Sequence, residues 1–437
     1  MLIAENILWL LVLIGVMILV HELGHFMVAR FFDVRVEVFS IGFGPQLFGR
    51  RGRETDFRVS AIPFGGYVRM AGEQPGDQAA DDPRAFLSKP RWQRMLIAFA
   101  GPAMNVVLAV SLLTGMFLFK YPKPVASDFT AVIGHVSPNS PAAKAGLREG
   151  DRIVRIDDIV NPNWDDVTIR EISSANRPLQ LEIERAGRRF NVTVVPALTP
   201  KEGVGYAGWA QEAEIQVSEV SPGMPAEKAG LKKGDLLLAV NHEPIRSRYK
   251  LQDVVRASEG KPVEIEFIRN GERMSVAIQP VYSEQEKRWM IGLAPDHRVI
   301  YTRLPLNQAF RESVRQNMRG ATLIFEFLRG IVAQRMSPKT LDGPIRIAQL
   351  SGDAARQGAY SFINLMAAVS LNLAIINLLP IPILDGGIIL MLLVEMAVRR
   401  DLSIQVKEAV FKFGFVFLLM IMAFVIFNDI SKMLPSG

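Results

Sequence analysis

Four long apolar runs limit what this chain can fold into, because each is long enough to cross a lipid bilayer as a helix. About 20 apolar residues suffice for one crossing. Hydrophobic residues make up 49% of the 437 residues, a high share for a wholly soluble protein. We therefore predict a polytopic α-helical membrane protein with four spans, at residues 1–32, 95–119, 359–398 and 408–428.

Basic residues indicate the orientation of these spans. They are dense in the loop that follows the first run, and they recur after the third run as Arg399, Arg400 and Lys407. Short loops rich in Lys and Arg remain in the cytoplasm. The sequence therefore predicts that both termini and the polar region 120–358 lie outside the cytoplasm.

The first run contains the sequence HELGH, which places His21, Glu22 and His25 among apolar neighbours. Ionisable groups at membrane depth are costly and usually functional. Residues four apart share one face of a helix, so both histidines can bind one metal ion while Glu22 lies beside it. Zinc lowers the pKa of bound water to about 7, and a nearby glutamate can accept the proton. We predict a zinc site with His21 and His25 as ligands and Glu22 as general base.

A third ligand is expected, because a catalytic zinc usually has three protein ligands. The chain has no cysteine, and its three other histidines lie in the polar region 120–358. The sequence Leu-Asp-Gly occurs twice, at 341–343 among polar residues and at 384–386 inside the third apolar run. A carboxylate at membrane depth is the better candidate, so we predict Asp385 as the third ligand.

The polar region contains an internal repeat. SPNSPAAKAGLREGD at 137–151 and SPGMPAEKAGLKKGD at 221–235 agree at ten of fifteen positions. Each copy shows a short helix that ends at glycine and leads into an apolar strand. This order is similar to bacterial PDZ domains, which bind a peptide end as an added strand and hold its carboxylate with backbone N–H groups. We predict two tandem α+β PDZ domains, at 125–200 and 210–285.

The carboxylate-holding loop of these domains is poorly marked. Gly205–Trp209, with the sequence GYAGW, is the candidate in the second copy, and the first copy shows no comparable pair of glycines. Binding of peptide tails and a steric or packing role are therefore both open for the two domains.

Residues 33–94 are predicted to form a β region with a cytoplasmic loop. Apolar and polar residues alternate over 34–71 between glycine-rich turns, which is typical of strands. An exposed strand edge can hold an extended chain by main-chain hydrogen bonds. The alternative is a hairpin that only connects two spans. Residues 286–358 are predicted as an amphipathic linker region.

Taken together, these features resemble the site-2 protease family of intramembrane zinc metalloproteases, in the branch of the regulator of sigma-E protease. The resemblance rests on HExxH in the first span, on N-x-x-P-x-P-x-L-D-G at Asn377–Gly386, and on the PDZ pair between them. It implies that His21, His25 and Asp385 bind Zn²⁺ and that Glu22 is catalytic. It also implies that Asn377 holds substrate backbone, with interhelical hydrogen bonding as the alternative role.

The resemblance further implies regulated intramembrane proteolysis at the bacterial inner membrane, within an envelope stress response. Expected substrates are spanning segments of single-pass membrane proteins, such as an anti-sigma factor stub left by a first protease, and remnant signal peptides. The active site would lie near the cytoplasmic side, with the PDZ domains in the periplasm. The β region 33–94 would be a membrane-associated sheet that holds the opened substrate.

Other classes of protein share some of these sequence features. A catalytically inactive, membrane-anchored PDZ scaffold remains the alternative. A metal transporter is disfavoured, because its pathway needs polar groups through several spans and here they gather at one depth. A nucleic-acid partner is not expected, since the formal charge is only +6 and no basic cluster is interleaved with aromatic residues.

Overall fold

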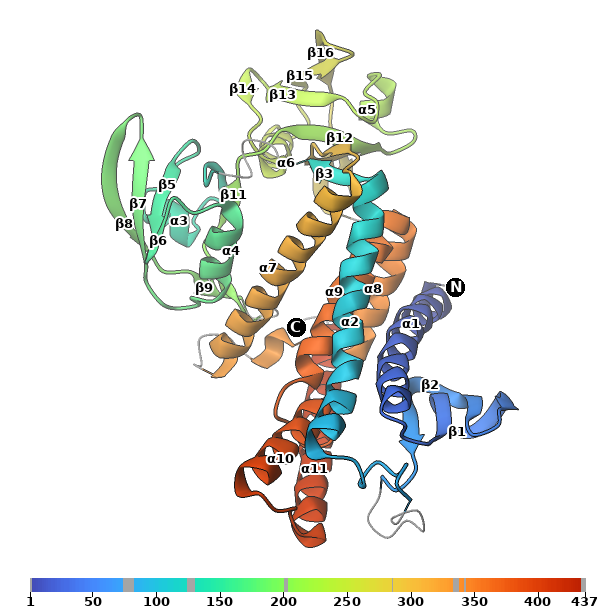
Figure 1. Ribbon diagram of the computed structural model, residues 1–437. Coiled ribbons are helices and arrows are strands. Elements are labelled where there is room, and N and C mark those ends of the chain that lie inside the picture. The colour runs from blue at the N-terminus through green and yellow to red at the C-terminus, as the bar shows by residue number, and fades with distance from the viewer. Residues whose placement is uncertain are drawn as a thin grey trace. The chain divides into compact units, whose positions relative to one another are not determined.

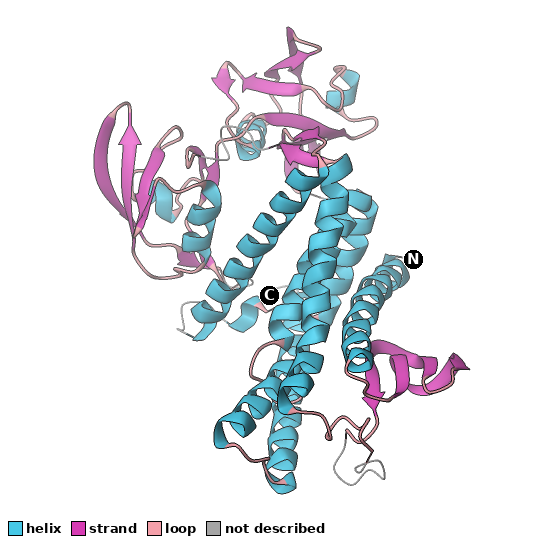
Figure 2. Ribbon diagram, in the orientation of Figure 1, coloured by secondary structure: helices cyan, strands magenta, loops and turns pink. Residues whose placement is uncertain are grey.

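The computed structural model describes residues 2–73, 82–123, 130–199, 203–284, 286–332, 338–341 and 343–433. The chain forms two compact units. Unit 1 comprises residues 1–121, 303–326 and 341–437, and unit 2 comprises residues 122–302 and 327–340. Unit 1 is mostly helical with one pair of strands, whereas unit 2 combines strands with short helices (Figure 2).

Helices that could span a membrane form most of unit 1. By length and composition, four helices of the described chain qualify: α1 (Leu2–Phe31), α2 (Arg91–Phe119), α9 (Ala359–Asn377) and α11 (Ile404–Met433). Large apolar side chains on α11 are exposed, with Phe413 at 66% and Phe427 at 69%. Such a surface suits the hydrocarbon of a membrane. Each of the four predicted spans therefore has a helix in the structure.

The third apolar run is broken in the middle. Helix α9 ends at Asn377, and α10 (Asp385–Val398) begins eight residues later, after a turn that contains two prolines. The chain folds back closely here, because a Cβ on Gly386 would lie 2.2 Å from the carbonyl oxygen of Leu379. The glycine after the aspartate is thus required by packing, and the turn places Asp385 at the start of a helix.

A strand pair packs against the end of α1. Strands β1 (Val36–Arg51) and β2 (Asp56–Met70) are antiparallel, which confirms the strands predicted over 34–71. The near half of the pair is buried against α1 and α2, whereas the far half of β1 is exposed. The exposed far half carries apolar side chains from both strands: Phe43, Leu47, Phe48, Phe57, Val59 and Ile62.

Two further helices complete unit 1, and both come from the predicted linker region. The first part of α7 (Leu306–Val332) packs on α2 and α9, and α8 (Pro344–Gln357) packs on α1 and α9. Asp429 of α11 accepts hydrogen bonds from the backbone N–H groups of Gly343 and Ile345 at the start of α8, at 2.8 and 3.0 Å. The first Leu-Asp-Gly segment therefore meets the end of α11, although Asp342 itself lies outside the described residues.

Unit 2 contains two copies of one topology at a constant offset of 84 residues (Figure 1). We name residues 131–211 the first repeat and residues 215–297 the second repeat. The first has β4 (Ile133–Val136), α3 (Pro141–Lys144), β5 (Arg152–Ile156), β6 (Ile159–Val160), α4 (Trp164–Ile172), β7 (Leu179–Arg185), β8 (Arg188–Val194), β9 (Ala197–Leu198), β10 (Gly205–Tyr206) and β11 (Trp209–Gln211).

The second repeat follows the same order. It has β12 (Ile215–Val220), α5 (Pro225–Lys228), β13 (Leu236–Val240), β14 (Glu243–Pro244), α6 (Arg248–Ala257), β15 (Val263–Arg269), β16 (Glu272–Ile278), β17 (Val281–Ser283), β18 (Arg288–Met290) and β19 (Leu293–His297). Short strands β3 (Tyr121–Lys123) and β20 (Ile300–Thr302) pair outside the repeats. Each repeat has its own buried apolar core.

The closing strand of each repeat corrects one prediction. Strand β11 pairs with β4, and β19 pairs in the same way with β12, so both repeats extend past the predicted ends at 200 and 285. The predicted start at 125 lies outside the described residues.

Assigning Gly205–Trp209 to the second copy was wrong, because this segment closes the first repeat: Ser137 N–H donates to the carbonyl of Gly208. Its counterpart in the second repeat is Trp289–Leu293, with the sequence WMIGL.

Candidate metal centre

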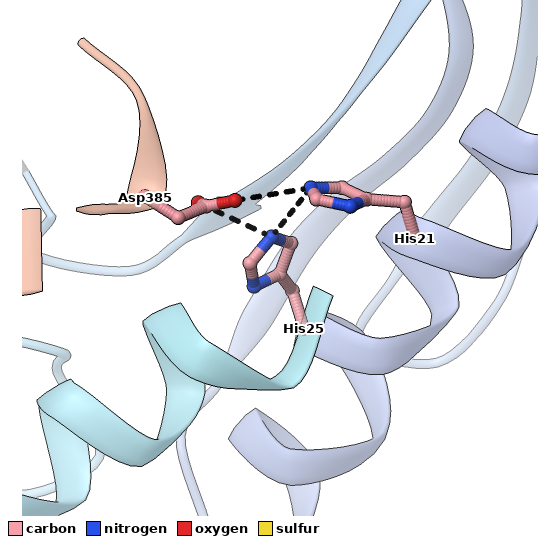
Figure 3. Close-up of side chains that lie close together, drawn as sticks. All are labelled: His21, His25 and Asp385. Carbon is pink, nitrogen blue, oxygen red and sulfur yellow. Dashed lines mark hydrogen bonds and ion pairs between the residues drawn. The ribbon is translucent and has the colours of Figure 1, made fainter. Parts of the chain in front are cut away.

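Three of the predicted site residues come together between two helices of unit 1. His21 and His25 lie one turn apart on α1, and Asp385 is the first residue of α10. Their donor atoms point toward one another (Figure 3). His21 Nε2 lies 3.2 Å from His25 Nε2 and 3.2 Å from Asp385 Oδ2, and His25 Nε2 lies 3.5 Å from Asp385 Oδ1.

These spacings fit a tetrahedral zinc ion. Zinc binds histidine nitrogen and carboxylate oxygen at about 2.0–2.2 Å, so two ligand atoms of a tetrahedral site lie about 3.3 Å apart. Among the residues that the structure describes, one group of His, Asp and Glu side chains could hold a metal ion. It consists of His21, His25 and Asp385. Two imidazole nitrogens and one carboxylate leave a fourth position for water, as in catalytic zinc sites.

The second nitrogen of each histidine is also held. His25 Nδ1 donates to the carbonyl oxygen of Ile97 at 2.8 Å, which leaves the lone pair on Nε2 for a metal. His21 Nδ1 lies 3.2 Å from the side-chain amide of Asn105, whose Oδ1 is buried and has no partner. With the amide turned by 180°, Oδ1 accepts the Nδ1–H of His21, which leaves the lone pair on Nε2 of His21 for a metal. Both rings are thereby oriented toward the shared centre.

Glu22 lies beside this centre on the same turn of α1. It is 9% exposed, and the backbone N–H of Val68 in β2 is a hydrogen-bond partner of its carboxylate. The fit against β2 is close, since a Cβ on Gly66 would lie 3.0 Å from Cγ of Glu22. The strand pair therefore holds the Glu22 carboxylate beside the three predicted metal ligands.

Asp385 gains its position from the start of α10. The first N–H groups of a helix have no intrahelical partner and favour negative charge nearby. The Asp385 carboxylate lies at this helix end, with its oxygens 3.2 Å from His21 Nε2 and 3.5 Å from His25 Nε2.

Asn377 is the last residue of α9 and is half-buried. Among the described residues, the metal-binding group consists of His21, His25 and Asp385 without Asn377, so its predicted role in holding substrate stays a prediction.

Two residues of α2 belong to the site and were missed from the sequence. Asn105 is fully buried against His21, and Gly101 lies under both rings: a Cβ there would be 2.3 Å from His25 Nε2 and 2.7 Å from His21 Nε2. The available signal was the segment GPAMN within the second apolar run, where an amide at membrane depth is unusual.

The close approach at Gly101 makes a specific prediction. Gly101→Ala places a methyl group where the two Nε2 atoms converge, so we expect purified protein to lose most of its zinc and its activity while the helices remain folded. Gly115→Ala on the same helix is the control, because nothing lies within 4 Å of its added Cβ. Zinc content by mass spectrometry, with thermal unfolding measured in parallel, checks this. Full zinc occupancy in Gly101→Ala would show that the rings are not held as described.

The chain is similar to known proteins over nearly its whole length. The model of peptidase family M50 matches residues 9–421. The regulator of sigma-E protease RseP of Salmonella typhimurium is 31% identical over 454 residues, covering 98% of this chain and 100% of that protein. A putative zinc metalloprotease of Vibrio cholerae is 29% identical over 460 residues, covering 98% and 100%. The solved PDZ domain of the SdrC-like protein from Listeria monocytogenes is 18% identical, covers 20% of this chain and 90% of that chain, and has a TM-score of 0.18.

Proposed function

The chain belongs to peptidase family M50 and is a zinc metalloprotease of the membrane, and we propose that it hydrolyses peptide bonds inside the spanning segments of single-pass membrane proteins. One observation carries this proposal. The donors of the metal centre lie on α1, which is apolar and long enough to span a bilayer, and on α10, which begins inside the third apolar run. A substrate bond that reaches this centre would itself lie at membrane depth.

The proposed roles follow from the positions of the side chains. His21, His25 and Asp385 would hold the zinc ion. Zinc bound there supplies a water of lowered pKa and polarises the substrate carbonyl. Glu22 accepts the proton of the attacking water as oxygen adds to the carbonyl carbon. Glu22 then passes that proton to the amide nitrogen as the C–N bond breaks, which releases an amine and a carboxylic acid.

The strand pair is proposed to present the substrate. A helical segment must be opened before its peptide bonds become accessible, and an extended chain can add to a strand edge through main-chain hydrogen bonds. Strand β2 contacts Glu22 through Val68 and Gly66, so a chain held along this pair would pass near the catalytic base. The exposed apolar far half of the pair suits a membrane-associated sheet. Asn377 is proposed to hold the substrate backbone from the end of α9.

The setting of the reaction is also a proposal. The relatives named as regulators of sigma-E protease support substrates such as an anti-sigma factor stub, and remnant signal peptides are a second group. We place the enzyme in the bacterial inner membrane, with its active site near the cytoplasmic side. The two repeats are proposed to be tandem periplasmic PDZ domains that either bind substrate tails or screen substrates by size.

A reporter assay tests this function. The reporter is a single-pass membrane protein already trimmed on its outer side, mixed with purified enzyme in lipid vesicles. We expect a product cut within the span, and no product after zinc is removed by a chelator that enters membranes. A scaffold without catalysis would bind the reporter and leave it intact in both conditions.

A further inference from the structure

The loop that closes the first repeat already holds a carboxylate. Glu171, in the last turn of α4, accepts a hydrogen bond from the backbone N–H of Ala207 through Oε1 at 2.6 Å. Its Oε2 accepts from the indole Nε1–H of Trp209 at 2.7 Å, and the nearby backbone N–H of Gly208 also lowers the pKa of this carboxyl. Consecutive N–H groups around one carboxylate are the arrangement by which PDZ domains hold the end of a peptide.

The fit between this helix and the loop is close. A Cβ on Gly205 would lie 2.1 Å from the carbonyl oxygen of Glu171, so glycine allows the last turn of α4 to pack on the loop. Ala207 is fully buried and Trp209 is 8% exposed. Burial raises the pKa of the Glu171 carboxyl to about 7. The N–H donors lower this pKa, but their effect is smaller than that of burial. The side chain is therefore withdrawn from solvent into the loop.

The second repeat has the same loop without the carboxylate. At the offset of 84 residues, Ala207 and Gly208 correspond to Ile291 and Gly292, and the matching backbone bonds from Ala226 and Ser221 are present. Gly208 and Gly292 share a left-handed φ of 83° and 78°. The position of Glu171 is taken by Val255, which is 4% exposed. In the described part of the chain, no side-chain carboxylate bonds to the N–H of Ile291 or Gly292.

We propose that Glu171 is a built-in ligand that keeps the carboxylate loop of the first repeat closed to peptide tails, and that replacing it converts this loop into a tail-binding site. The inference rests on the proposed PDZ function of the repeats. Two hydrogen bonds that already hold the Glu171 carboxyl in the loop compete with any incoming carboxylate. The two carboxylate loops therefore differ at one position. Glu171 fills the loop of the first repeat, whereas Val255 leaves the loop of the second repeat without a side-chain carboxylate.

Counting carboxylate-dependent binding sites tests this proposal on the full chain in detergent. The probe is a fluorescent peptide of about ten residues with an apolar last residue and a free carboxylate, compared with the same peptide ending in an amide. We expect Glu171→Val to gain one site over the wild type, about tenfold or more tighter for the free carboxylate than for the amide. Asp165→Val, on the exposed side of the same helix, should bind as the wild type does. The count compares variant with wild type, so it does not depend on what the second repeat binds.

A second measurement keeps the proposal testable if Glu171→Val does not fold. The indole N–H signal of Trp209 in the wild type can be followed by NMR, because the chain has only five tryptophans. We expect it to stay unchanged at peptide concentrations that saturate other sites. A wild-type signal that shifts with the free-carboxylate peptide and not with the amide, or a folded Glu171→Val without the additional site, would overturn the proposal. Because neither readout involves proteolysis, failure here is distinguishable from failure of the protease function.

Discussion

Replacing Glu22 by Gln should abolish cleavage and leave the zinc site filled. Glutamine keeps the size of the side chain, and Glu22 is not among the residues that could hold the metal. The variant loses the group that accepts and returns the proton, a function worth roughly 10²–10⁴-fold in rate. We therefore expect about one zinc per chain, an unchanged unfolding temperature, and turnover of a single-pass reporter lowered by that factor.

Glu5→Gln is the matched control for this experiment. Glu5 is on the same helix, but it is half-buried and pairs with Arg356 at 3.5 Å rather than belonging to the metal centre. The control should cut the reporter at the wild-type rate. If Glu22→Gln also retains wild-type turnover, Glu22 is not the base.

Asp385→Asn should have the largest effect on metal content. An amide is a far weaker zinc ligand than a carboxylate, and the neutral side chain no longer balances the charge of the ion. We expect zinc in the purified protein to fall from about one ion per chain toward none, with cleavage lost as a consequence. His21→Phe should give the same result, because it removes a nitrogen that lies 3.2 Å from both other donors.

The first Leu-Asp-Gly segment, at 341–343, supplies the control for Asp385. Asp342→Asn makes the same chemical change in the same short sequence, in a segment whose Gly343 meets Asp429 instead of the histidines. It should keep both zinc and activity. Zinc loss in Asp342→Asn with full occupancy in Asp385→Asn would reverse the assignment of the third ligand.

The grouping of His21, His25 and Asp385 could be predicted from the sequence because its signals are local, and their role as zinc ligands stays a prediction. His21 and His25 share a helix face at a fixed spacing, and Asp385 stands out as a carboxylate in an apolar run. The strands over 34–71 were predicted for the same reason, since alternation is a property of the segment itself.

The missed features depend on contacts between distant segments. Asn105 and Gly101 become part of the site only through the way α2 crosses α1, and no spacing within either helix reveals that crossing. The loop Gly205–Trp209 was assigned to the wrong repeat because it follows the first copy by many residues and joins it only through long-range contacts, such as the pairing of β11 with β4. Long-range pairing of this kind is set by the fold and not by the local pattern.

The central claim is that the bond is cut at membrane depth by Glu22 at a zinc centre. Its most direct measurement is mass-spectrometric mapping of the products of one purified single-pass substrate in lipid vesicles, with wild-type enzyme and Glu22→Gln compared at equal zinc content. The account predicts a wild-type cut within the apolar span of the substrate and almost no cut by Glu22→Gln. A cut confined to the soluble tails, or the same products at the same rate from Glu22→Gln, would contradict it.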